Sequence, residues 1–275
     1  MVRLSKRLYL IAKMVTKGNR VADVGCDHGY LSIYLVQSKI SPTALAMDVR
    51  KGPLSHAREN IEKCGLSGYI GTRLSDGLKE YHPGEADTLV CAGMGGPLMI
   101  QILSENPEKS RDFKELILQP QSEIWKVRAF IRELGFAIVE EEICLEDGKY
   151  YFPMRAVKSD CIDSDFVEPD FVKQDFVKQD FVKQDFVKPD FVEPDFVNSQ
   201  SKGDTDADLK IYDLYGKYLI LKKDPLLKQY LSERKLLLIQ ILDSLENTEN
   251  ERTRERIEQV QEELECIDRV YELMG

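Results

Sequence analysis

Short apolar runs and segments of helical periodicity alternate along the first 158 residues of the chain. The apolar runs predict strands at residues 21–24, 43–47, 69–73, 88–92 and 115–118. Between the second and third runs, apolar residues recur at three- and four-residue spacing and predict a helix over residues 54–64. Alternation of strand and helix favours an α/β, Rossmann-like fold, with a doubly wound, mostly parallel sheet covered on both faces.

The alternation ends near residue 137. Residues 137–145 and 150–157 are two extended runs joined by Asp147-Gly148, a dipeptide typical of tight turns. They predict an antiparallel hairpin at one edge of the sheet.

A second periodic region begins at Asp224-Pro225, where aspartate suits the helix cap and proline suits the first turn. Two series of apolar residues follow, separated by the polar residues 246–251, and Arg234 interrupts the first series. The members of the two series are Leu227, Leu231, Leu238, Ile241 and Leu245, then Ile257, Val260, Leu264, Ile267, Tyr271 and Met274. We expect two helices that fold back on each other as an antiparallel coiled-coil hairpin.

Between these regions, the tripeptide Asp-Phe-Val recurs seven times from Asp165 to Val197, at five-residue steps. A five-residue period matches neither a helix nor a strand, so the phenylalanines cannot share one face. We expect a low-complexity, disordered insert. The predicted organisation is a domain over residues 1–158, the insert over 159–206 and the helical hairpin over 207–275.

The most specific chemical signal lies where the first strand ends. A glycine turn containing Gly25 and Asp27 leads into a helix, and Asp48 ends the second strand about 20 residues later. Such a turn lets the backbone approach a ligand, and the acid can accept two hydrogen bonds from ribose hydroxyls. In a dinucleotide site the position of Asp27 holds a glycine that makes room for a pyrophosphate.

A carboxylate at this position repels phosphates and attracts cations. S-adenosylmethionine has a sulfonium and an ammonium group and no phosphate, so the acidic residues Asp23 and Asp27 favour it over a dinucleotide. The alternative is an acid-terminated strand without a cofactor, as any α/β domain can have. Other strand ends support a ligand site, because Asp76, Gly93 and Gln119 also fall at carboxyl ends, where such sheets bind ligands.

Three motifs follow one another in the sequence: residues 23–31 (DVGCDHGYL), 92–96 (AGMGG) and 116–121 (LILQPQ). With these motifs the chain resembles class I S-adenosylmethionine-dependent methyltransferases. It resembles more closely the bacterial family that methylates N1 of the adenine at position 22 of tRNA. The resemblance covers residues 1 to about 158 and resumes in the helical tail from about residue 209.

The resemblance implies an enzyme with S-adenosyl-L-methionine as cofactor and tRNA as partner, without a metal. The cofactor-binding residues are then expected to be Asp23, Gly25, Cys26, Asp27, Asp48, Val49, Asp76, Gly77, Ala92, Gly93 and Met94. The substrate-binding residues are expected to be Arg3, Lys6, Arg7, Tyr30, Gly95, Gly96, Gln119 and Gln121. The alternatives are a methyltransferase for another RNA or a small molecule, and a non-catalytic RNA-binding protein on the same fold.

Asp27 and His28 are the candidate catalytic residues. Asp27 could stabilise the positive charge that develops on the adenine ring, or it could anchor the cofactor ammonium or cap the following helix. His28 could contact the target base or only satisfy the turn. Tyr30 could stack on a base, although a tyrosine here more commonly packs under the loop.

Other polar side chains have less specific roles. His56 and His82 lie in polar contexts and are interpreted as structural, whereas Gln119 and Gln121 could read a base edge with their amides. The Gly93 to Gly96 segment has an open backbone, in contrast to the Asp/Asn-Pro-Pro-aromatic motif of exocyclic-nitrogen methyltransferases.

The net charge of −10 is unevenly distributed. Residues 1–158 hold 22 basic and 20 acidic residues, residues 159–206 hold 5 and 13, and residues 207–275 hold 11 and 15. Six basic and no acidic residues lie in residues 1–20, on a predicted helix that could hold phosphates or could simply be solvated. The resemblance favours the RNA-binding interpretation, and the acidic surplus of the tail argues against a purely electrostatic RNA clamp there.

The six cysteines show no metal-binding spacing, which favours a reduced, cytoplasmic protein over a disulfide scaffold. No run resembles a signal peptide or a membrane span, because four basic residues interrupt the apolar residues 1–15. The oligomeric state stays open between monomer and homodimer.

Overall fold

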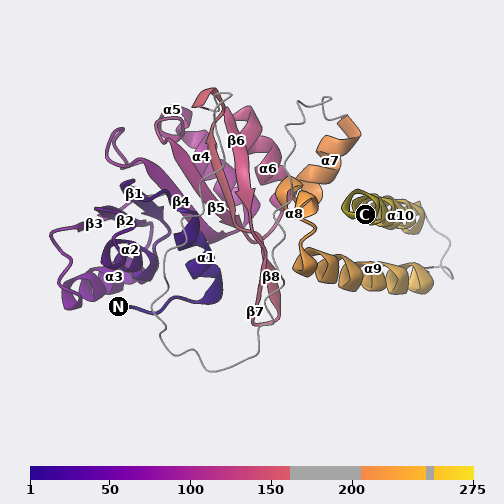
Figure 1. Ribbon diagram of the computed structural model, residues 1–275, viewed down its shortest axis with the longest axis horizontal. Helices are drawn as coiled ribbons and strands as arrows, with labels where there is room; N and C mark the ends of the chain where they lie inside the picture. Colours follow the sequence, from indigo (N-terminus) through magenta and orange to yellow (C-terminus); the bar gives the residue numbers. More distant parts are fainter. Residues whose placement is uncertain (162–205, 246–250) are drawn as a thin grey trace.

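The computed structural model of the chain describes residues 1–161, 206–245 and 251–275. These residues form a seven-stranded sheet of order β3-β2-β1-β4-β5-β9-β6 (Figure 1). Strands β1 to β5 are parallel, whereas β9 is antiparallel to both β5 and β6. The strands are β1 (Val21–Val24), β2 (Ala44–Asp48), β3 (Ile70–Leu74), β4 (Thr88–Met94), β5 (Glu115–Pro120), β6 (Phe136–Glu141) and β9 (Met154–Lys158). The predicted doubly wound α/β fold and its five parallel strands are confirmed.

Helices cover both faces of the sheet. Neighbouring residues of one strand point to opposite faces, so that Val90 of β4 faces one helical layer and Leu89 faces the other. The first layer contains α1 (Lys6–Met14), α2 (Tyr30–Gln37) and α3 (Lys51–Lys63). The second contains α4 (Gly96–Glu105) and α6 (Ile124–Glu133), with the short α5 (Pro107–Ser110) after α4.

The predicted edge hairpin forms, but both of its arms are interrupted. Only β6 and β9 belong to the main sheet, and a separate two-stranded ribbon, β7 (Cys144–Glu146) and β8 (Lys149–Tyr151), extends from them. The interruption coincides with Pro153, which has no amide hydrogen to donate to a neighbouring strand and is bonded only through its carbonyl, to the Glu142 amide. The ribbon projects between α1 and the tail helix α9 (Pro225–Leu245) (Figure 1).

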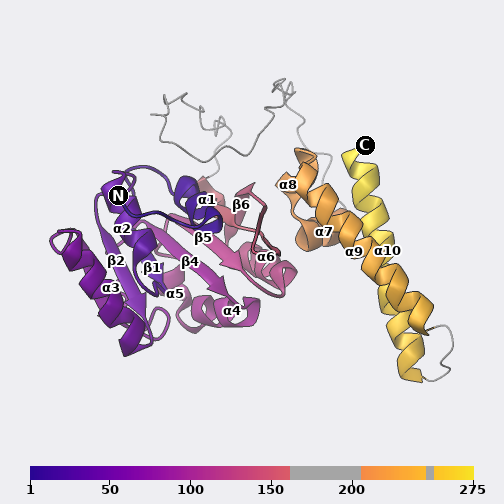
Figure 2. The ribbon, with the colours of Figure 1, turned by 90° about the horizontal axis from the view of Figure 1, so that it is seen from below.

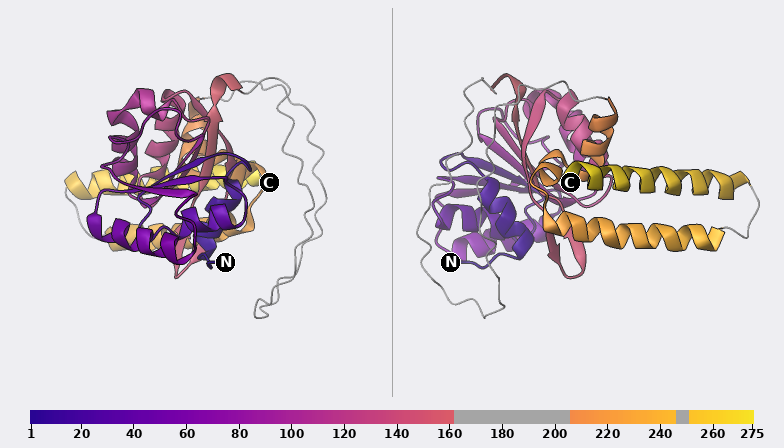
Figure 3. Two further views of the ribbon diagram at one scale, coloured as in Figure 1. Left: turned by 90° about the vertical axis from the view of Figure 1, so that its left-hand side faces the viewer. Right: turned by 45° about the vertical axis from the view of Figure 1, so that its right-hand side comes forward.

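The remaining helices form a tail beside the sheet (Figure 2). Two helices that the apolar series did not predict, α7 (Asp206–Tyr215) and α8 (Lys217–Leu221), pack against α6 and β6. They lead to α9 and α10 (Glu251–Met274), which lie side by side and extend away from the sheet (Figure 3).

The predicted helix start of the tail is confirmed, and the residues of the predicted apolar seam, except Leu245 and Ile257, belong to one hydrophobic cluster. The Asp224 carboxylate accepts hydrogen bonds from the amides of Leu226 and Leu227, as a cap does. Arg234, which interrupts the seam, pairs with Glu263 of α10 at 2.6 Å. Of the predicted turn over residues 246–251, only Glu251 is described, and it begins α10. The Asp-Phe-Val repeats, residues 165–197, lie outside the described residues.

Neither a membrane span nor a metal site is found in the part of the chain that the structure describes. No helix there is both long and apolar enough to cross a membrane. No group of three or more histidine, cysteine, aspartate or glutamate side chains there could hold a metal ion.

Candidate active site

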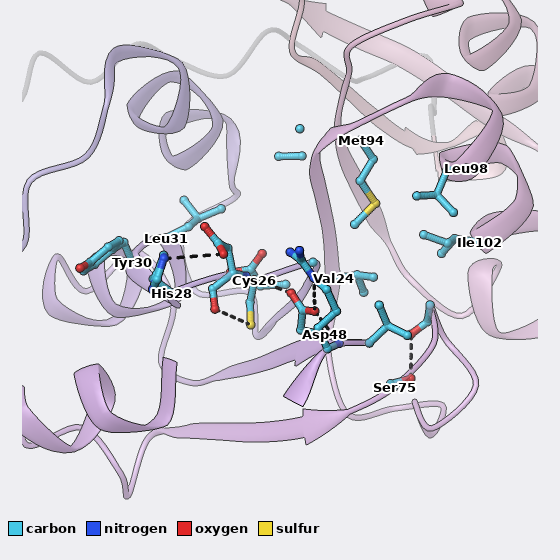
Figure 4. Close-up of a pocket in the computed structure, with 18 of the residues that line it drawn as sticks. Val24, Cys26, His28, Tyr30, Leu31, Asp48, Ser75, Met94, Leu98 and Ile102 are labelled. Carbon is cyan, nitrogen blue, oxygen red and sulfur yellow. Dashed lines mark hydrogen bonds and ion pairs between the residues drawn. The ribbon is translucent and has the colours of Figure 1, made fainter. Parts of the chain in front are cut away.

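A pocket of about 470 Å³ lies beyond the carboxyl ends of the central parallel strands (Figure 4). The loops after β1, β2, β3 and β4 form most of its wall, and α1 and α4 complete it. The residues expected to bind the cofactor all line this pocket, namely Asp23, Gly25, Cys26, Asp27, Asp48, Val49, Asp76, Gly77, Ala92, Gly93 and Met94. Arg7, His28 and Tyr30 line it as well. The topology therefore brings together residues that are up to 95 positions apart in the chain, between Arg7 and Ile102.

The turn after β1 depends on residues with positive φ. Gly25 has a φ of +79°, and a Cβ atom there would lie 2.1 Å from the Cε of Met94. The amides of Gly25 and Cys26 both donate to the carbonyl of Met47, which ties the turn to β2. The positive φ favours glycine here, and a Cβ atom would in addition require the terminal methyl of Met94 to move.

Asp48 is buried at the end of β2, yet its carboxylate reaches the pocket. Its Oδ1 accepts the Arg50 amide at 2.8 Å, and its Oδ2 accepts the Asp27 amide at 3.3 Å. Each oxygen keeps a second lone pair for a ligand, since a carboxylate oxygen can accept two hydrogen bonds. Two backbone amides thus hold a bidentate acceptor in place before any ligand arrives.

The β1 end of the pocket is acidic. Burial raises the pKa of Asp23 to about 6, partly offset by the hydrogen bond from the Ser32 hydroxyl at 2.8 Å. Asp27, with a φ of +51°, presents a side chain that is 63% exposed. Burial also raises the pKa of the Cys26 thiol, so this cysteine is a neutral wall of the pocket and not a thiolate nucleophile.

The other end of the pocket has an apolar wall on α4, opposite Ser75 and Asp76 of the loop after β3. Leu98 and Ile102 lie one helical turn apart on α4, and Figure 4 shows them on the side of the pocket opposite His28 and Tyr30. Ile102 also packs against Gly77, whose φ is +57°. An acidic end, a bidentate acid in the middle and an apolar end match the ammonium, the ribose and the adenine of S-adenosylmethionine.

Several residues expected to bind substrate lie elsewhere. Gln119 is fully buried, and its Oε1 accepts from Arg7 Nη1 at 3.2 Å, so its amide supports Arg7 and does not face the pocket. Gly96 begins α4, and a Cβ atom there would lie 2.4 Å from the Ser122 carbonyl, which gives this glycine a packing role. The others outside the pocket lining are Arg3, Lys6, Gly95 and Gln121.

The structure bears on two of the alternatives for the turn after β1. Tyr30 does not pack under the loop, because 44% of its surface is exposed. Asp27 is not the N-cap residue of α2, because that position is held by Gly29, which has no side chain to cap the helix. Both residues are therefore available to a ligand.

The structure adds pocket residues that the motifs did not indicate. Arg50 follows directly on the Asp48 motif, so its position beside the acid could have been predicted. Leu98 and Ile102 follow the glycine-rich segment with a four-residue spacing, which is also the spacing of ordinary core residues. The further additions are Leu8, Val24, Leu31 and Ser75.

Comparisons with known proteins agree with this geometry. A family profile described as a methyltransferase domain matches residues 4–154. The tRNA (adenine(22)-N(1))-methyltransferase of Bacillus subtilis is 37% identical over 159 residues, which cover 58% of this chain and 67% of that protein.

Solved structures match over nearly the whole chain. The Bacillus subtilis m1A22 tRNA methyltransferase TrmK superposes with a TM-score of 0.72 at 26% identity, over 98% of this chain and 99% of that one. A candidate tRNA (m1A22) methyltransferase of Streptococcus pneumoniae was crystallised with S-adenosyl-L-methionine. It superposes with a TM-score of 0.71 at 25% identity, over 98% of this chain and 99% of that one.

The fold and the pocket are those of a class I S-adenosylmethionine-dependent methyltransferase. The chain belongs to the methyltransferase-domain family and, within it, to the family of the bacterial tRNA (adenine(22)-N(1))-methyltransferases.

Proposed function

We propose that this protein transfers a methyl group from S-adenosylmethionine to N1 of the adenine at position 22 of tRNA. The observation that carries the proposal is the pocket in which Asp48, the glycine turn and an exposed carboxylate, Asp27, converge. The relationship to the Bacillus subtilis enzyme supports the choice of substrate and of the nucleotide position.

The residues of the pocket fit the cofactor. Asp48 would accept both ribose hydroxyls, while Val49, Leu98 and Ile102 would surround the adenine. Asp23 would face the positively charged methionine end, where a cation favours the ionised carboxylate. When bound, S-adenosylmethionine supplies an electrophilic methyl group on its sulfonium.

Adenine N1 needs no prior deprotonation, so the chief task of the protein is to align this nitrogen with the methyl group. The wall of glycine backbone at Gly93 permits close approach of a flat ring. Attack leaves a positive charge on the ring, and a nearby carboxylate stabilises that charge.

Asp27 is the residue proposed for this task. Its side chain is exposed to the pocket, and its backbone is held by the hydrogen bond to Asp48. His28 Nε2 lies 3.8 Å from Asp27 Oδ1, so the imidazole is placed to orient this carboxylate or to contact the base beside it.

The basic first helix would guide tRNA to the pocket. Arg7 reaches the pocket itself, whereas Arg3 and Lys6 are exposed outside it, where they could contact phosphates. This role would place the protein in the cytoplasm with tRNA. The division into a methyltransferase domain (1–158), an insert (159–206) and a coiled-coil tail (207–275) is proposed on the same basis.

The decisive experiment maps 1-methyladenosine at position 22 in tRNA from cells with and without this protein. The purified protein should also transfer labelled methyl groups to unmodified tRNA. Replacement of adenine 22 by guanine should abolish incorporation. Incorporation that persists in this variant, or that does not require tRNA, would contradict the proposed substrate.

A further inference from the structure

Three aromatic rings form a continuous exposed surface at one end of the pocket. His28 occupies the centre, with its ring centroid 5.9 Å from that of Tyr30 and 5.3 Å from that of His56. Both neighbouring rings are tilted by only 31° to 33° from the plane of His28. The three residues come from the loop after β1, from α2 and from α3, and we call them the aromatic ledge.

All three rings of the ledge are at least partly exposed to solvent. The side chain of His28 is 43% exposed, Tyr30 is 44% exposed, and His56 is exposed on α3. By contrast, another tyrosine of α2, Tyr34, packs edge-on against Tyr9 of α1. Rings left in water beside a pocket offer flat faces on which another ring can stack.

The proposed cofactor does not account for the ledge. The apolar residues that suit its adenine, Leu98 and Ile102, lie at the opposite side of the pocket (Figure 4). His56 lies outside the pocket lining altogether and extends the ledge away from it along α3. A ligand that covers His56 must therefore be larger than the cofactor and must pass over the rim at His28.

The surroundings suit a polyanion. Arg50, immediately before α3, is 70% exposed, and Lys51 at the start of α3 is also exposed. Two acids lie beside the ledge, and each has a partner: Asp27 Oδ1 is 3.8 Å from His28 Nε2, and Glu59, three residues after His56 on α3, is 3.8 Å from Lys63. Stacking rings beside exposed cations are the features with which proteins bind unpaired nucleotides.

We propose that the aromatic ledge binds an unpaired nucleobase of the tRNA next to the target adenine, with His56 as the outer stacking residue. This inference rests on the proposed function and extends it, because it assigns a second nucleotide-binding subsite to the same pocket. His56 acts by contact with the substrate and takes no part in the methyl transfer.

The test measures binding of unmodified tRNA and of cofactor separately. His56→Ala should raise the Kd for tRNA about tenfold, the loss typical of one stacked base, and should leave the Kd for S-adenosylmethionine unchanged. His56→Phe keeps a flat ring without charge and should bind tRNA within about twofold of the unchanged protein. His82→Ala is the matched control, since His82 is the third histidine of the chain, is exposed, and lies in the loop before β4, outside the pocket lining.

The outcomes separate the two proposals. Unchanged tRNA affinity in His56→Ala, or equal losses in His56→Ala and His56→Phe, would overturn the stacking role even if adenine 22 is methylated. Tenfold weaker tRNA binding by His56→Ala alone would support the ledge even if the methylated position is another one. A protein that does not bind tRNA would overturn both proposals.

Discussion

At the level of single residues, the pocket contains two carboxylates that differ in burial and in how they are held. Asp48 is buried and held by two backbone amides, whereas Asp27 is largely exposed and is held mainly through its backbone. A rigid acceptor suits ribose recognition, and an exposed charge near the reacting ring suits transition-state stabilisation. Asp23 is a third case, because burial penalises its charge.

The first prediction concerns Asp48→Ala. The variant loses two ribose hydrogen bonds to a charged acceptor, each worth about 1.5–3 kcal/mol, so cofactor affinity should fall at least about a hundredfold. Affinity for tRNA should change little. Calorimetry with cofactor and a separate tRNA-binding assay check this, and unchanged cofactor affinity would contradict it.

The second prediction concerns Asp27→Asn. This substitution keeps the size of the side chain and removes its charge, so turnover should fall at least about tenfold, which corresponds to about 1.4 kcal/mol of transition-state stabilisation. The measurement is kcat at saturating cofactor and tRNA. If Asp27 only anchors the cofactor ammonium, raising the cofactor concentration will restore full turnover.

The third prediction concerns Asp23. Burial raises its pKa to about 6, so in the absence of cofactor the folded protein binds this proton more tightly than the unfolded chain does. As pH rises from about 4 to 6, ionisation of Asp23 costs the fold about 1–3 kcal/mol. Asp23→Asn removes this cost and keeps an acceptor for Ser32.

The free energy of unfolding of Asp23→Asn should therefore exceed that of the unchanged protein at about pH 7, and the difference should shrink towards pH 4. Urea denaturation across this pH range measures both. A difference that is independent of pH would show that the pKa of Asp23 is the same in the folded and the unfolded chain.

At the level of elements, the β7–β8 ribbon joins the first helix to the tail. On one side, Glu146 Oε1 accepts the Lys6 amide at 2.6 Å, and the Arg7 guanidinium lies over the Tyr151 ring at 5.5 Å. On the other side, Tyr150 packs edge-on against Tyr230 of α9, with the ring centroids 5.1 Å apart. The ribbon thus supports the wall of the pocket that Arg7 provides.

The fourth prediction is that Glu146→Ala lowers kcat/KM for tRNA about tenfold. The variant removes the acceptor for the start of α1 and the carboxylate 3.9 Å from Arg7 Nε, so Arg7 loses one of its supports. Glu146→Gln keeps an acceptor and should lose less. Steady-state kinetics test this, with Lys149→Ala, an exposed residue of the same ribbon, as the control; equal effects in Glu146→Ala and Lys149→Ala would contradict a specific role for Glu146.

At the level of the whole molecule, a buried ion pair attaches the tail to the methyltransferase domain. Arg128 and Glu141 are each 2% exposed and pair at 2.7 Å. Arg128 also donates to the carbonyl of Asp213 near the end of α7, and Glu141 accepts from the Tyr218 amide near the start of α8. The pair therefore satisfies backbone groups at two helix ends that would otherwise be buried without partners.

The fifth prediction is that Arg128→Leu lowers the free energy of unfolding by about 3–5 kcal/mol, because it leaves Glu141 charged and unpaired in the interior. Arg132→Leu is the matched control on the same helix. Its pair with Asp213 is more exposed, with Arg132 at 42%, and its loss should cost about 1 kcal/mol or less. Denaturant titration of both variants checks the contrast, and equal losses would contradict it.

The parallel strands, the glycine turn and the acid at the end of β2 could be predicted from the sequence because local interactions determine them. Periodicity places a run in a strand, a positive φ selects glycine at position 25, and an open sheet binds ligands at its carboxyl edge. The eleven expected cofactor residues met in one pocket because most of them follow strands that the apolar pattern had already located.

Contacts between segments far apart in the sequence decided the roles of the other residues in and around the site. Gln119 supports Arg7 across 112 residues, Gly96 is needed because the Ser122 carbonyl passes over it, and His56 meets His28 only because α3 packs beside the turn. Gly216 is likewise constrained by a distant residue, since a Cβ atom there would lie 2.8 Å from the Glu141 carboxylate. No local pattern records such neighbours, because each depends on packing of side chains from separate elements, and that packing exists only once the chain has folded.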